Sequence, residues 1–344
     1  MTLHTDSTCG CSRRGFLGTA MTCSAYVAFA LAGAGPAVQR AFAGVALGEE
    51  IQTEPHARVE KIAEGVWAVV STPFANGVEN PETTTFSNGG IIAGRDGVLA
   101  IEGFATATGA AWQSDLALAL TGRRPTHVVI THHHFDHSTG LVGYQRGNEG
   151  PEIISTMETR NLVIERIASP VENAEGPGQH LNPAGRILTP DRVIADASQP
   201  TEIDLGGRVV RLVPRAGHTA SDLTIEIDDP RVIWTGDLCF NRLFPYFGDA
   251  TPSLLAENGR ALLTEADTVY VPGHGPVADA AGLRPYLDLL ADIEVAARRF
   301  HDAGVSPGEA WERYEIPESL GEWTKFRPDV SRFAFEAWER ELGG

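Results

Sequence analysis

Short hydrophobic runs separated by turn-forming residues predict β-strands in the first third of the chain. Two pairs of runs fit hairpins: 59–62 with 66–70 around Glu64-Gly65, and 90–93 with 98–101 around Arg95-Asp96-Gly97. Runs of this length on either side of a Gly-containing turn are typical of antiparallel strands. The polar, turn-rich stretch 71–85 between the two pairs is predicted to be a loop.

A change of hydrophobic period marks the first helix. Trp112, Leu116 and Leu120 are spaced four apart, which places them on one face of a helix over Thr106–Leu120. The apolar run Val128–Ile130 follows this helix and predicts a buried strand. Because strand, helix and strand succeed one another, we predict an α/β sandwich.

In the rest of the chain, segments with the hydrophobic spacing of a helix alternate with short apolar runs typical of strands. The expected elements are helices at 138–144, 158–168, 251–264 and 280–303, a strand at 153–156, strands from 208 to 234, and a helical tail over 306–344. The stretch 169–191 contains four Pro and three Gly and is expected to be irregular. We expect the aromatic residues of the tail to pack in a core rather than to bind a ligand or a partner.

The amino-terminal segment has the features of an export signal. Arg13-Arg14, within 12–17, resembles a twin-arginine motif, an apolar stretch follows over 15–38, and Ala41-Phe42-Ala43 is a small-x-small cleavage site. We predict that residues 1–43 are a signal peptide that the twin-arginine export machinery recognises and that is then removed. The mature protein would be periplasmic or secreted, with no stable membrane anchor. A retained transmembrane anchor is the alternative, and lipid attachment at Cys23 is a weaker one.

Removal of that signal makes the chain more acidic. The full sequence has a net charge of −18, and the first 43 residues contain three basic and one acidic residue, so the mature net charge is −20. A surface of this charge repels phosphate backbones, which argues against nucleic acid as a partner. Of the four cysteines only Cys239 remains after cleavage, so the mature chain cannot form an intrachain disulfide.

The densest candidate chemistry follows the apolar run 128–130. His132, His134, Asp136 and His137 stand within six residues. Side chains two positions apart point the same way in an extended or turning segment, so His132 and His134 can bind one metal while Asp136 and His137 turn to a second. His133 then points elsewhere. With 11 His in 344 residues, this spacing is specific for a metal site, and a surface His cluster is the alternative.

Three further candidate ligands, His218, Asp237 and His274, each follow a β-rich run and lie beside glycine. A glycine next to a ligand lets the backbone turn sharply and approach a metal closely. We therefore expect all three on loops along one edge of a sheet. Together with the first cluster they supply five His and two Asp, which suits two borderline metal ions.

The order His-x-His-x-Asp-His, then His, Asp and His, resembles the metallo-β-lactamase superfamily over about 59–290. The resemblance implies an αββα four-layer sandwich, with a catalytic domain at 44–304 and a C-terminal helical extension at 305–344. It also implies a first metal held by His132, His134 and His218, a second held by Asp136, His137 and His274, and Asp237 as the bridge between them. Di-iron relatives carry Glu at the position of His134, so two Zn²⁺ per chain are favoured.

The same resemblance implies the chemistry. Two zinc ions share a water whose pKa falls to roughly 7, which makes hydroxide available as the nucleophile. Asp136 is the candidate catalytic residue, because it would hold the second metal and manage the proton of that water. The expected substrate is a small molecule with an ester, lactone, thioester or amide bond. The resemblance argues against a β-lactam, because the β-lactamases proper usually carry Cys or Ser where Asp237 stands.

Other readings stay open. The fold also occurs in metal-binding accessory proteins without turnover and in single-iron sulfur dioxygenases. Glu102 stands where relatives usually carry an Asp behind a ligand His, which implies that Glu102 orients one. Phe240 stands where acyl-homoserine lactonases usually place Tyr, and the C-terminal tail lacks an evident basic set for glutathione. The loop 71–85 would overhang the metal site as in relatives, or be a plain surface loop.

Overall fold

The computed structural model describes residues 47–71, 85–168, 188–263, 267–325 and 331–343. The predicted signal peptide lies outside these ranges, as do nearly all of the predicted loop 71–85 and most of the irregular stretch 169–191. Those predictions are therefore not tested by the structure. Within the described ranges, no helix is both long enough and apolar enough to cross a membrane.

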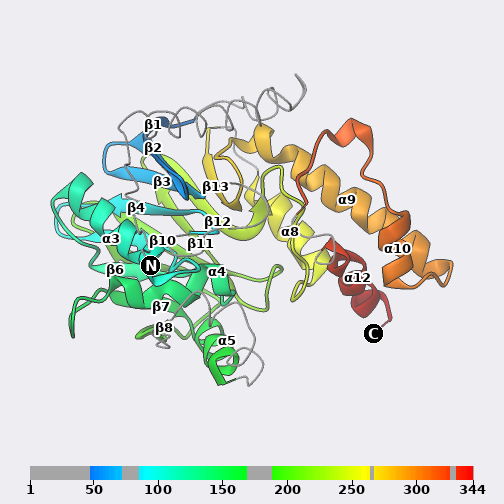
Figure 1. The fold of residues 1–344 in the computed structure, drawn as a ribbon, viewed down its shortest axis with the longest axis horizontal. Helices are drawn as coiled ribbons and strands as arrows, with labels where there is room; N and C mark the ends of the chain where they lie inside the picture. Colours follow the sequence, from blue (N-terminus) through cyan, green and yellow to red (C-terminus); the bar gives the residue numbers. More distant parts are fainter. Residues whose placement is uncertain (1–46, 72–84, 169–187, 264–266, 326–330, 344) are drawn as a thin grey trace, which may run out of the picture. The chain divides into compact units, whose positions relative to one another are not determined.

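The larger sheet has eight strands in the order β1 to β8 (Figure 1). The strands are β1 Glu49–Glu54, β2 Ala57–Ala63, β3 Val66–Ser71, β4 Gly89–Ala93, β5 Val98–Ile101, β6 His127–Val129, β7 Glu152–Thr156 and β8 Arg192–Ile194. Neighbours from β1 to β5 are antiparallel, and neighbours from β5 to β8 are parallel. Both predicted hairpins, β2–β3 and β4–β5, are confirmed.

The smaller sheet has five strands in the order β13-β12-β11-β10-β9. Its strands are β9 Thr201–Asp204, β10 Val209–Arg215, β11 Asp222–Asp228, β12 Arg231–Phe240 and β13 Val269–His274. The pair β12–β13 is parallel and the other pairs are antiparallel. Carboxyl ends of parallel strands meet at one edge, so residues at the ends of β12 and β13 lie close together.

Helices cover the outer faces of the two sheets. They are α3 Ala107–Thr121, α4 Phe135–Ser138, α5 Met157–Ala168, α8 Pro252–Leu262, α9 Ala280–Asp302, α10 Pro307–Arg313 and α12 Phe333–Gly343, with 3₁₀ turns η1 Thr139–Tyr144 and η2 Glu318–Leu320. Helices α3 and α5 contact strands of the larger sheet, and α8 and α9 contact β12. The predicted four-layer αββα sandwich with C-terminal helices is confirmed (Figure 1).

Strand β3 shows how a central strand serves two cores. All of its residues are buried. Val66, Ala68 and Val70 lie in the core between the sheets, whereas Trp67 and Val69 lie in the core that also contains Leu116 and Ala117 of α3. Successive side chains point to opposite faces of a strand. Burial of each large aliphatic side chain contributes about 1.5–3 kcal/mol, so both faces of β3 stabilise the sandwich.

The C-terminal helices share a core with α8 and α9. Phe335 and Trp338 of α12 are 3% and 2% exposed, and they pack with residues of α9 and β12. Trp311 and Trp323 are half-buried against the same core. The prediction that tail aromatics are packing residues is confirmed for these side chains, whereas Phe326 lies outside the described residues.

The predicted helix over 138–144 is confirmed to within one residue, but it is a 3₁₀ helix. An α-helical turn, α4, already begins at Phe135, and Thr139–Tyr144 form a 3₁₀ helix. Glycines explain the change, because Gly140 and Gly143 bring this backbone against the start of α3. A Cβ atom on Gly143 would lie 1.9 Å from the carbonyl oxygen of Ala107. The close approach of this backbone to the start of α3 determines the type of helix, and a hydrophobic pattern does not reveal such a contact.

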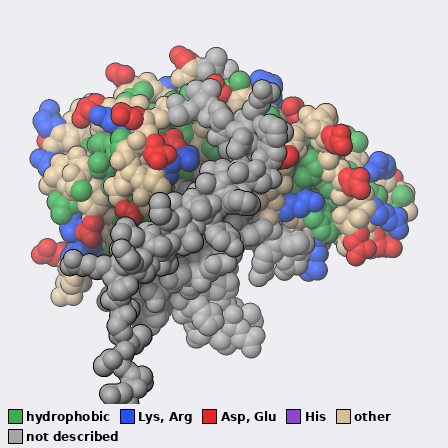
Figure 2. Space-filling view, turned by 45° about the horizontal axis from the view of Figure 1, so that its top comes forward, with side chains coloured by type: hydrophobic (Ala, Val, Ile, Leu, Met, Phe, Trp, Pro, Cys, Tyr) green, Lys and Arg blue, Asp and Glu red, His purple; other side chains and the backbone are tan. Residues whose placement is uncertain are grey.

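Figure 2 shows one face of the molecule, on which acidic and basic side chains are intermixed among the described residues.

Candidate metal centre

The predicted ligands lie on strands and loops of both sheets and, for Asp136 and His137, on helix α4, and they gather at one edge. His132 and His134 follow β6, whereas His218 follows β10. His274 is the last residue of β13. Asp237 and His274 correct our expectation of loop positions, because His274 belongs to β13 and Asp237 lies within β12, next to a register shift at Gly236. The irregular strand still carries the carboxylate to the same edge as the five imidazoles.

A first group contains three imidazoles and one carboxylate: His132, His134, His218 and Asp237, whose ligand atoms lie within 4.8 Å of one another. Nδ1 of His134 is 3.0 Å from Nε2 of His132 and 3.0 Å from Nε2 of His218. Oδ2 of Asp237 is 3.2 Å from Nε2 of His218 and 3.9 Å from Nε2 of His132. Three nitrogens and one oxygen at these separations match the donor set of a tetrahedral metal site.

A second group contains Asp136, His137 and His274. Oδ2 of Asp136 is 3.3 Å from Nε2 of His274 and 3.6 Å from Nε2 of His137. The side chain of Asp136 is 12% exposed, whereas that of His137 is fully buried and that of His274 is 6% exposed. Asp136 is therefore the member of this group that solvent reaches most readily.

Asp237 lies between the two groups. Its Oδ2 faces His218, while its Oδ1 is 3.2 Å from Nε2 of His137 and 3.4 Å from Nε2 of His274. Among the described residues, Nε2 of His137 and Oδ1 of Asp237 have no hydrogen-bond partner, although both are buried. Buried polar atoms that approach each other without a hydrogen bond fit a shared metal ion, so the residues present suit the group that the sequence implies.

Glycines make room for these contacts. A Cβ atom on Gly273 would lie 1.9 Å from Oδ1 of Asp237, so only glycine lets β13 pass so close to that carboxylate. Gly217, Gly236 and Gly275 have φ angles of 140°, 51° and 93°, which are unfavourable for other residues. The expectation that glycines beside the ligands serve backbone turns and close approach is confirmed.

Glu102 supports the second group from behind. Its side chain is 1% exposed, and Oε1 lies 3.0 Å from Nδ1 of His137. Thr131 donates to the same carboxylate through Oγ1 at 2.6 Å and through its backbone N–H at 3.2 Å. A carboxylate on the second ring nitrogen fixes the orientation of a ligand His. This placement fits the orienting role that the resemblance implied for Glu102.

Asp249 lies on the outer side of the first group, and sequence reasoning missed it. Its Oδ2 lies 2.8 Å from Nε2 of His134. His133 lies outside both groups, and its Nε2 is 3.7 Å from the same carboxylate oxygen. His133, His134 and Asp249 are close enough to form a third, more exposed group of potential ligand atoms.

Two other polar residues that sequence reasoning missed hold the ligand loops. Asn88, just before β4, donates through Nδ2 to the carbonyl oxygens of Pro272 and Gly275, on either side of His274. Buried Asp222 accepts hydrogen bonds from the backbone N–H of His218 and from Oγ1 of Thr219. Burial raises the pKa of Asp222 to about 7, against the opposing effect of these hydrogen bonds.

Electrostatics divide the imidazoles into two kinds. Burial lowers the pKa of His132 well below its usual value and lowers that of His218 to about 3, so both rings are neutral at pH 7. Neutral imidazole is the form that binds metal. Burial also lowers the pKa of His137 and His274, but nearby carboxylates outweigh it, so the pKa of His274 rises to about 9. The negative charge that favours a proton on these rings also favours a metal cation.

Aromatic rings line the ligands. Phe240 stacks on His274 with ring centroids 5.2 Å apart and planes at 9°. Tyr246, half-buried in the loop after β12, has its ring 5.4 Å from that of His134 and 6.2 Å from that of His218. Burial raises the pKa of Tyr246 to about 12, so its hydroxyl stays protonated at neutral pH.

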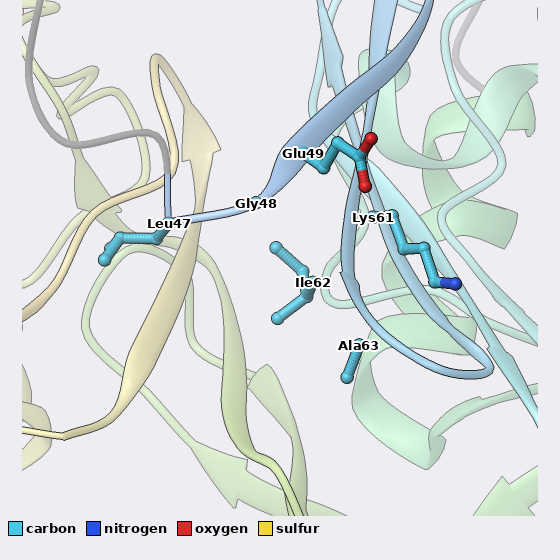
Figure 3. Close-up of a pocket in the computed structure, with 6 residues that line it drawn as sticks. All are labelled: Leu47, Gly48, Glu49, Lys61, Ile62 and Ala63. Carbon is cyan, nitrogen blue, oxygen red and sulfur yellow. The ribbon is translucent and has the colours of Figure 1, made fainter.

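A separate open cavity of about 530 Å³ lies at the start of β1 and the end of β2 (Figure 3). It is lined by Leu47, Gly48, Glu49, Lys61, Ile62 and Ala63. None of the candidate ligands belongs to this lining, so the cavity is not part of the metal centre.

The family model of the metallo-beta-lactamase superfamily matches residues 86–285, more than half of the chain and the whole set of candidate ligands. The chain belongs to the metallo-beta-lactamase superfamily. This superfamily member is a hydrolase with a His/Asp metal-binding cluster. No curated protein matches the chain at a significant level.

Solved structures share the fold of this superfamily member at low sequence identity. A beta-lactamase domain protein from Burkholderia ambifaria is 17% identical with a TM-score of 0.60, and the match covers 85% of this chain and 91% of that one. A metallo-beta-lactamase from Pontibacter korlensis is 20% identical with a TM-score of 0.53, over 68% and 99%. The sec-alkylsulfatase Pisa1 from Pseudomonas sp. is 17% identical with a TM-score of 0.60, over 83% and 50%. These likenesses support the fold alone.

Proposed function

We propose that this superfamily member is an exported dinuclear zinc hydrolase that cleaves an ester, lactone, thioester or amide bond in a small molecule. One observation carries the proposal: the two carboxylate oxygens of Asp237 face different groups. Oδ2 is 3.2 Å from Nε2 of His218, and Oδ1 is 3.2 Å from Nε2 of His137. A carboxylate in this position is suited to bridge two metal ions.

The donor set supports zinc. The two groups offer five imidazole nitrogens and the oxygens of two aspartates, and zinc binds both kinds of atom readily. His134 stands at the position where the di-iron relatives carry Glu. When bound, two zinc ions would polarise the scissile bond and supply a water with a pKa of roughly 7.

Asp136 is the residue that we assign to the proton of the attacking water. Its carboxylate lies beside His274 and His137 at the second group and is more exposed than the carboxylate of Asp237, at 12% against 4%. Burial raises the pKa of Asp136, but His137 and His274 outweigh it and hold the pKa at about 2. The carboxylate is therefore ionised at neutral pH and can accept a hydrogen bond from water.

The side chains around the ligands indicate which class of substrate fits the site. Phe240 covers one face of His274, and Tyr246 lies against His134 and His218. Phe240 is fully buried, so the half-buried ring of Tyr246 is the one that favours a substrate with an apolar portion next to its scissile bond. The net charge of −18 for the whole chain, or −20 after signal removal, argues against nucleic acid as the substrate.

The test is a substrate panel on zinc-loaded mature protein. It contains a nitrophenyl ester of a short fatty acid, an aliphatic γ-lactone, an acyl thioester, an aromatic amide and a chromogenic cephalosporin. A secondary alkyl sulfate is added because a sec-alkylsulfatase shares the fold. We expect turnover of at least one carboxylic substrate that is lost in the metal-free protein and restored by Zn²⁺.

Two outcomes would contradict the proposal. If only the secondary alkyl sulfate were turned over, the substrate class would be sulfate esters and not carboxylic acid derivatives. Full zinc loading with no turnover of any substrate would favour a metal-binding accessory role. Asp136→Asn serves as the matched control, because it should bind zinc while losing most of the turnover.

We also propose that the mature protein acts in the periplasm or outside the cell. The proposal rests on Arg13-Arg14, the apolar stretch after them and the cleavage site at 41–43. The twin-arginine machinery carries folded proteins, which suits an enzyme that binds its metal before export.

A further inference from the structure

His134 differs from the other imidazoles of the first group in the nitrogen that it presents. His132 and His218 point Nε2 toward the group, whereas His134 points Nδ1, at 3.0 Å from each of those two atoms. Nε2 of His134 therefore faces outward. There it lies 2.8 Å from Oδ2 of Asp249, in the loop after β12.

We propose that Asp249 is a positioning residue for His134, and that helix α12 holds Asp249 in place. The proposal rests on the proposed function only in that the first group binds a metal. A neutral imidazole can donate the lone pair of Nδ1 only when the proton is on Nε2. A carboxylate that accepts the Nε2–H bond selects this form, fixes the ring and makes Nδ1 a better donor.

Glu102 makes the same kind of contact in the second group, in a different environment. The side chain of Glu102 is 1% exposed, and that of Asp249 is 54% exposed. The buried carboxylate is enclosed by the fold and by Thr131. The position of the exposed carboxylate of Asp249 depends on its loop, so the contacts that hold this loop also hold the carboxylate.

Helix α12 supplies such contacts to this loop and to its continuation into α8. Nη2 of Arg340 donates to the carbonyl oxygen of Gly248, next to Asp249, at 2.9 Å. Phe333 packs edge-on against Tyr246 with ring centroids 5.6 Å apart. Glu341 accepts a hydrogen bond from the backbone N–H of Ser253 at 3.1 Å. The C-terminal helix thus holds both sides of the residue that orients a ligand.

The packing within the loop leaves little freedom. A Cβ atom on Gly248 would lie 2.0 Å from the hydroxyl oxygen of Tyr246. The backbone before Asp249 is therefore pressed against Tyr246, whose ring contacts His134 and His218. A shift of α12 would move Gly248, Tyr246 and Asp249 together.

An outer cation held by His133, His134 and Asp249 is the competing interpretation, since their ligand atoms lie within 4.8 Å. Two observations favour a hydrogen bond instead. The separation of 2.8 Å between His134 and Asp249 is a hydrogen-bond distance, and Nδ1 of His134 already faces the first group. An outer cation would require one imidazole to bind two metals.

The experiment measures zinc binding rather than turnover. Metal-free protein is titrated with Zn²⁺ in competition with a chromophoric chelator, for the wild type and for Asp249→Asn, Asp249→Glu and Arg340→Gln. Asp115→Asn and Arg313→Gln are matched controls, because both residues are exposed, form ion pairs and lie apart from the ligands. Thermal unfolding of each metal-free protein shows whether the fold is intact.

We expect Asp249→Asn to weaken one of the two zinc equivalents about 10- to 100-fold, with the metal-free melting temperature unchanged. Asp249→Glu should recover part of the affinity, Arg340→Gln should weaken the same equivalent to a smaller extent, and both controls should bind like the wild type. Wild-type affinity in Asp249→Asn would overturn the role of Asp249, and wild-type affinity in Arg340→Gln would overturn the role of α12.

The same titration would also detect an outer cation. A third zinc equivalent in the wild type that disappears in both His133→Ala and Asp249→Asn would make Asp249 a ligand and would overturn the positioning role. The outcomes also separate this inference from the proposed function. Wild-type protein that binds no zinc would contradict the proposed function, whereas normal binding in wild type and variants alike would contradict this inference alone.

Discussion

Nδ1 of His137 lies 3.0 Å from Oε1 of Glu102, in a part of the protein where both side chains are at most 1% exposed. The Glu102 backbone has a φ angle of 76°, which is uncommon for a residue with a side chain. Its backbone N–H donates to the carbonyl oxygen of Val129, which helps to hold this conformation. A strained backbone that brings a buried carboxylate to a ligand imidazole is typical of a functional site.

We predict that Glu102→Gln weakens zinc binding to the second group about 10- to 100-fold, because the amide keeps the size of the side chain but loses the charge that orients His137. Competition with a chelator measures the affinity. Glu60→Gln is the control, since Glu60 is also buried and paired, but with Arg58 away from the ligands. Equal loss in both variants would mean that general destabilisation, and not the contact with His137, is the cause.

A second prediction concerns the close approach of two strands. Gly273→Ala would place a Cβ atom 1.9 Å from Oδ1 of Asp237, so the carboxylate or strand β13 must move. We expect less than two zinc per chain and a loss of turnover, measured by elemental analysis and by the best substrate of the panel.

Gly308→Ala is the control for that variant, because a Cβ atom at Gly308 in α10 meets nothing within 4 Å. This variant should keep its zinc and its turnover. Full metal content in Gly273→Ala would show that Asp237 can shift without loss of the bridge.

The seven candidate ligands could be predicted because their pattern is local. Four of them lie within 132–137, and the other three stand beside glycines at the ends of, or inside, β-rich runs. The structure brings all seven into two adjacent groups. A short motif of unusual residue types can be recognised in the sequence without knowledge of the long-range contacts.

The supporting residues could not be predicted in the same way. Asn88 is 184 positions from Pro272, and Asp249 is 115 positions from His134. Asn and Asp are common in turns, so no local pattern distinguishes these two from surface residues. Their roles follow only from the meeting of the two sheets and of the loop after β12 with the ligand segment.

Secondary structure likewise divides into elements with a local sequence pattern, which could be predicted, and elements without one. The hairpins and the helices α3, α8 and α9 were predicted, because each has a clear hydrophobic period. Strand β1 was missed because its sequence, Glu49–Glu54, is mostly polar and exposed at a sheet edge. Strands β8 and β9 have three and four residues, too few to show a period.

We predict that the purified mature protein holds close to two zinc ions per chain, because two adjacent groups of ligands share Asp237. Chelators should remove the metal together with the turnover, and Zn²⁺ should restore both. Atomic emission is the measurement. A single iron per chain, with activity retained after zinc is removed, would point to the iron-using sulfur dioxygenase relatives instead.

A further prediction concerns export. Replacing Arg13 and Arg14 with Lys should leave the protein in the cytoplasm with its signal uncut, because recognition depends on the planar guanidinium pair that Lys does not reproduce. Cell fractionation and the mass of the chain provide the readout. Normal appearance of the double variant in the periplasm would show that the twin-arginine route is not used.

The last prediction separates catalysis from metal binding within the ligand set, by comparing Asp136→Asn with His132→Ala. The Asp136 side chain is the most exposed of the second group, and its carboxylate is ionised at neutral pH. The amide keeps an oxygen for the metal but loses the charge that accepts the proton of water. Turnover should therefore fall by about 10²- to 10⁴-fold, with much of the zinc retained.

His132→Ala removes a fully buried imidazole of the first group, 3.0 Å from Nδ1 of His134. Zinc content and turnover should fall together in this variant, because the first metal loses a ligand. The comparison depends on the ratio of turnover to bound zinc, which should drop sharply only in Asp136→Asn. If Asp136→Asn instead kept near wild-type turnover per bound zinc, Asp136 would be a replaceable ligand, and another group would have to handle the proton.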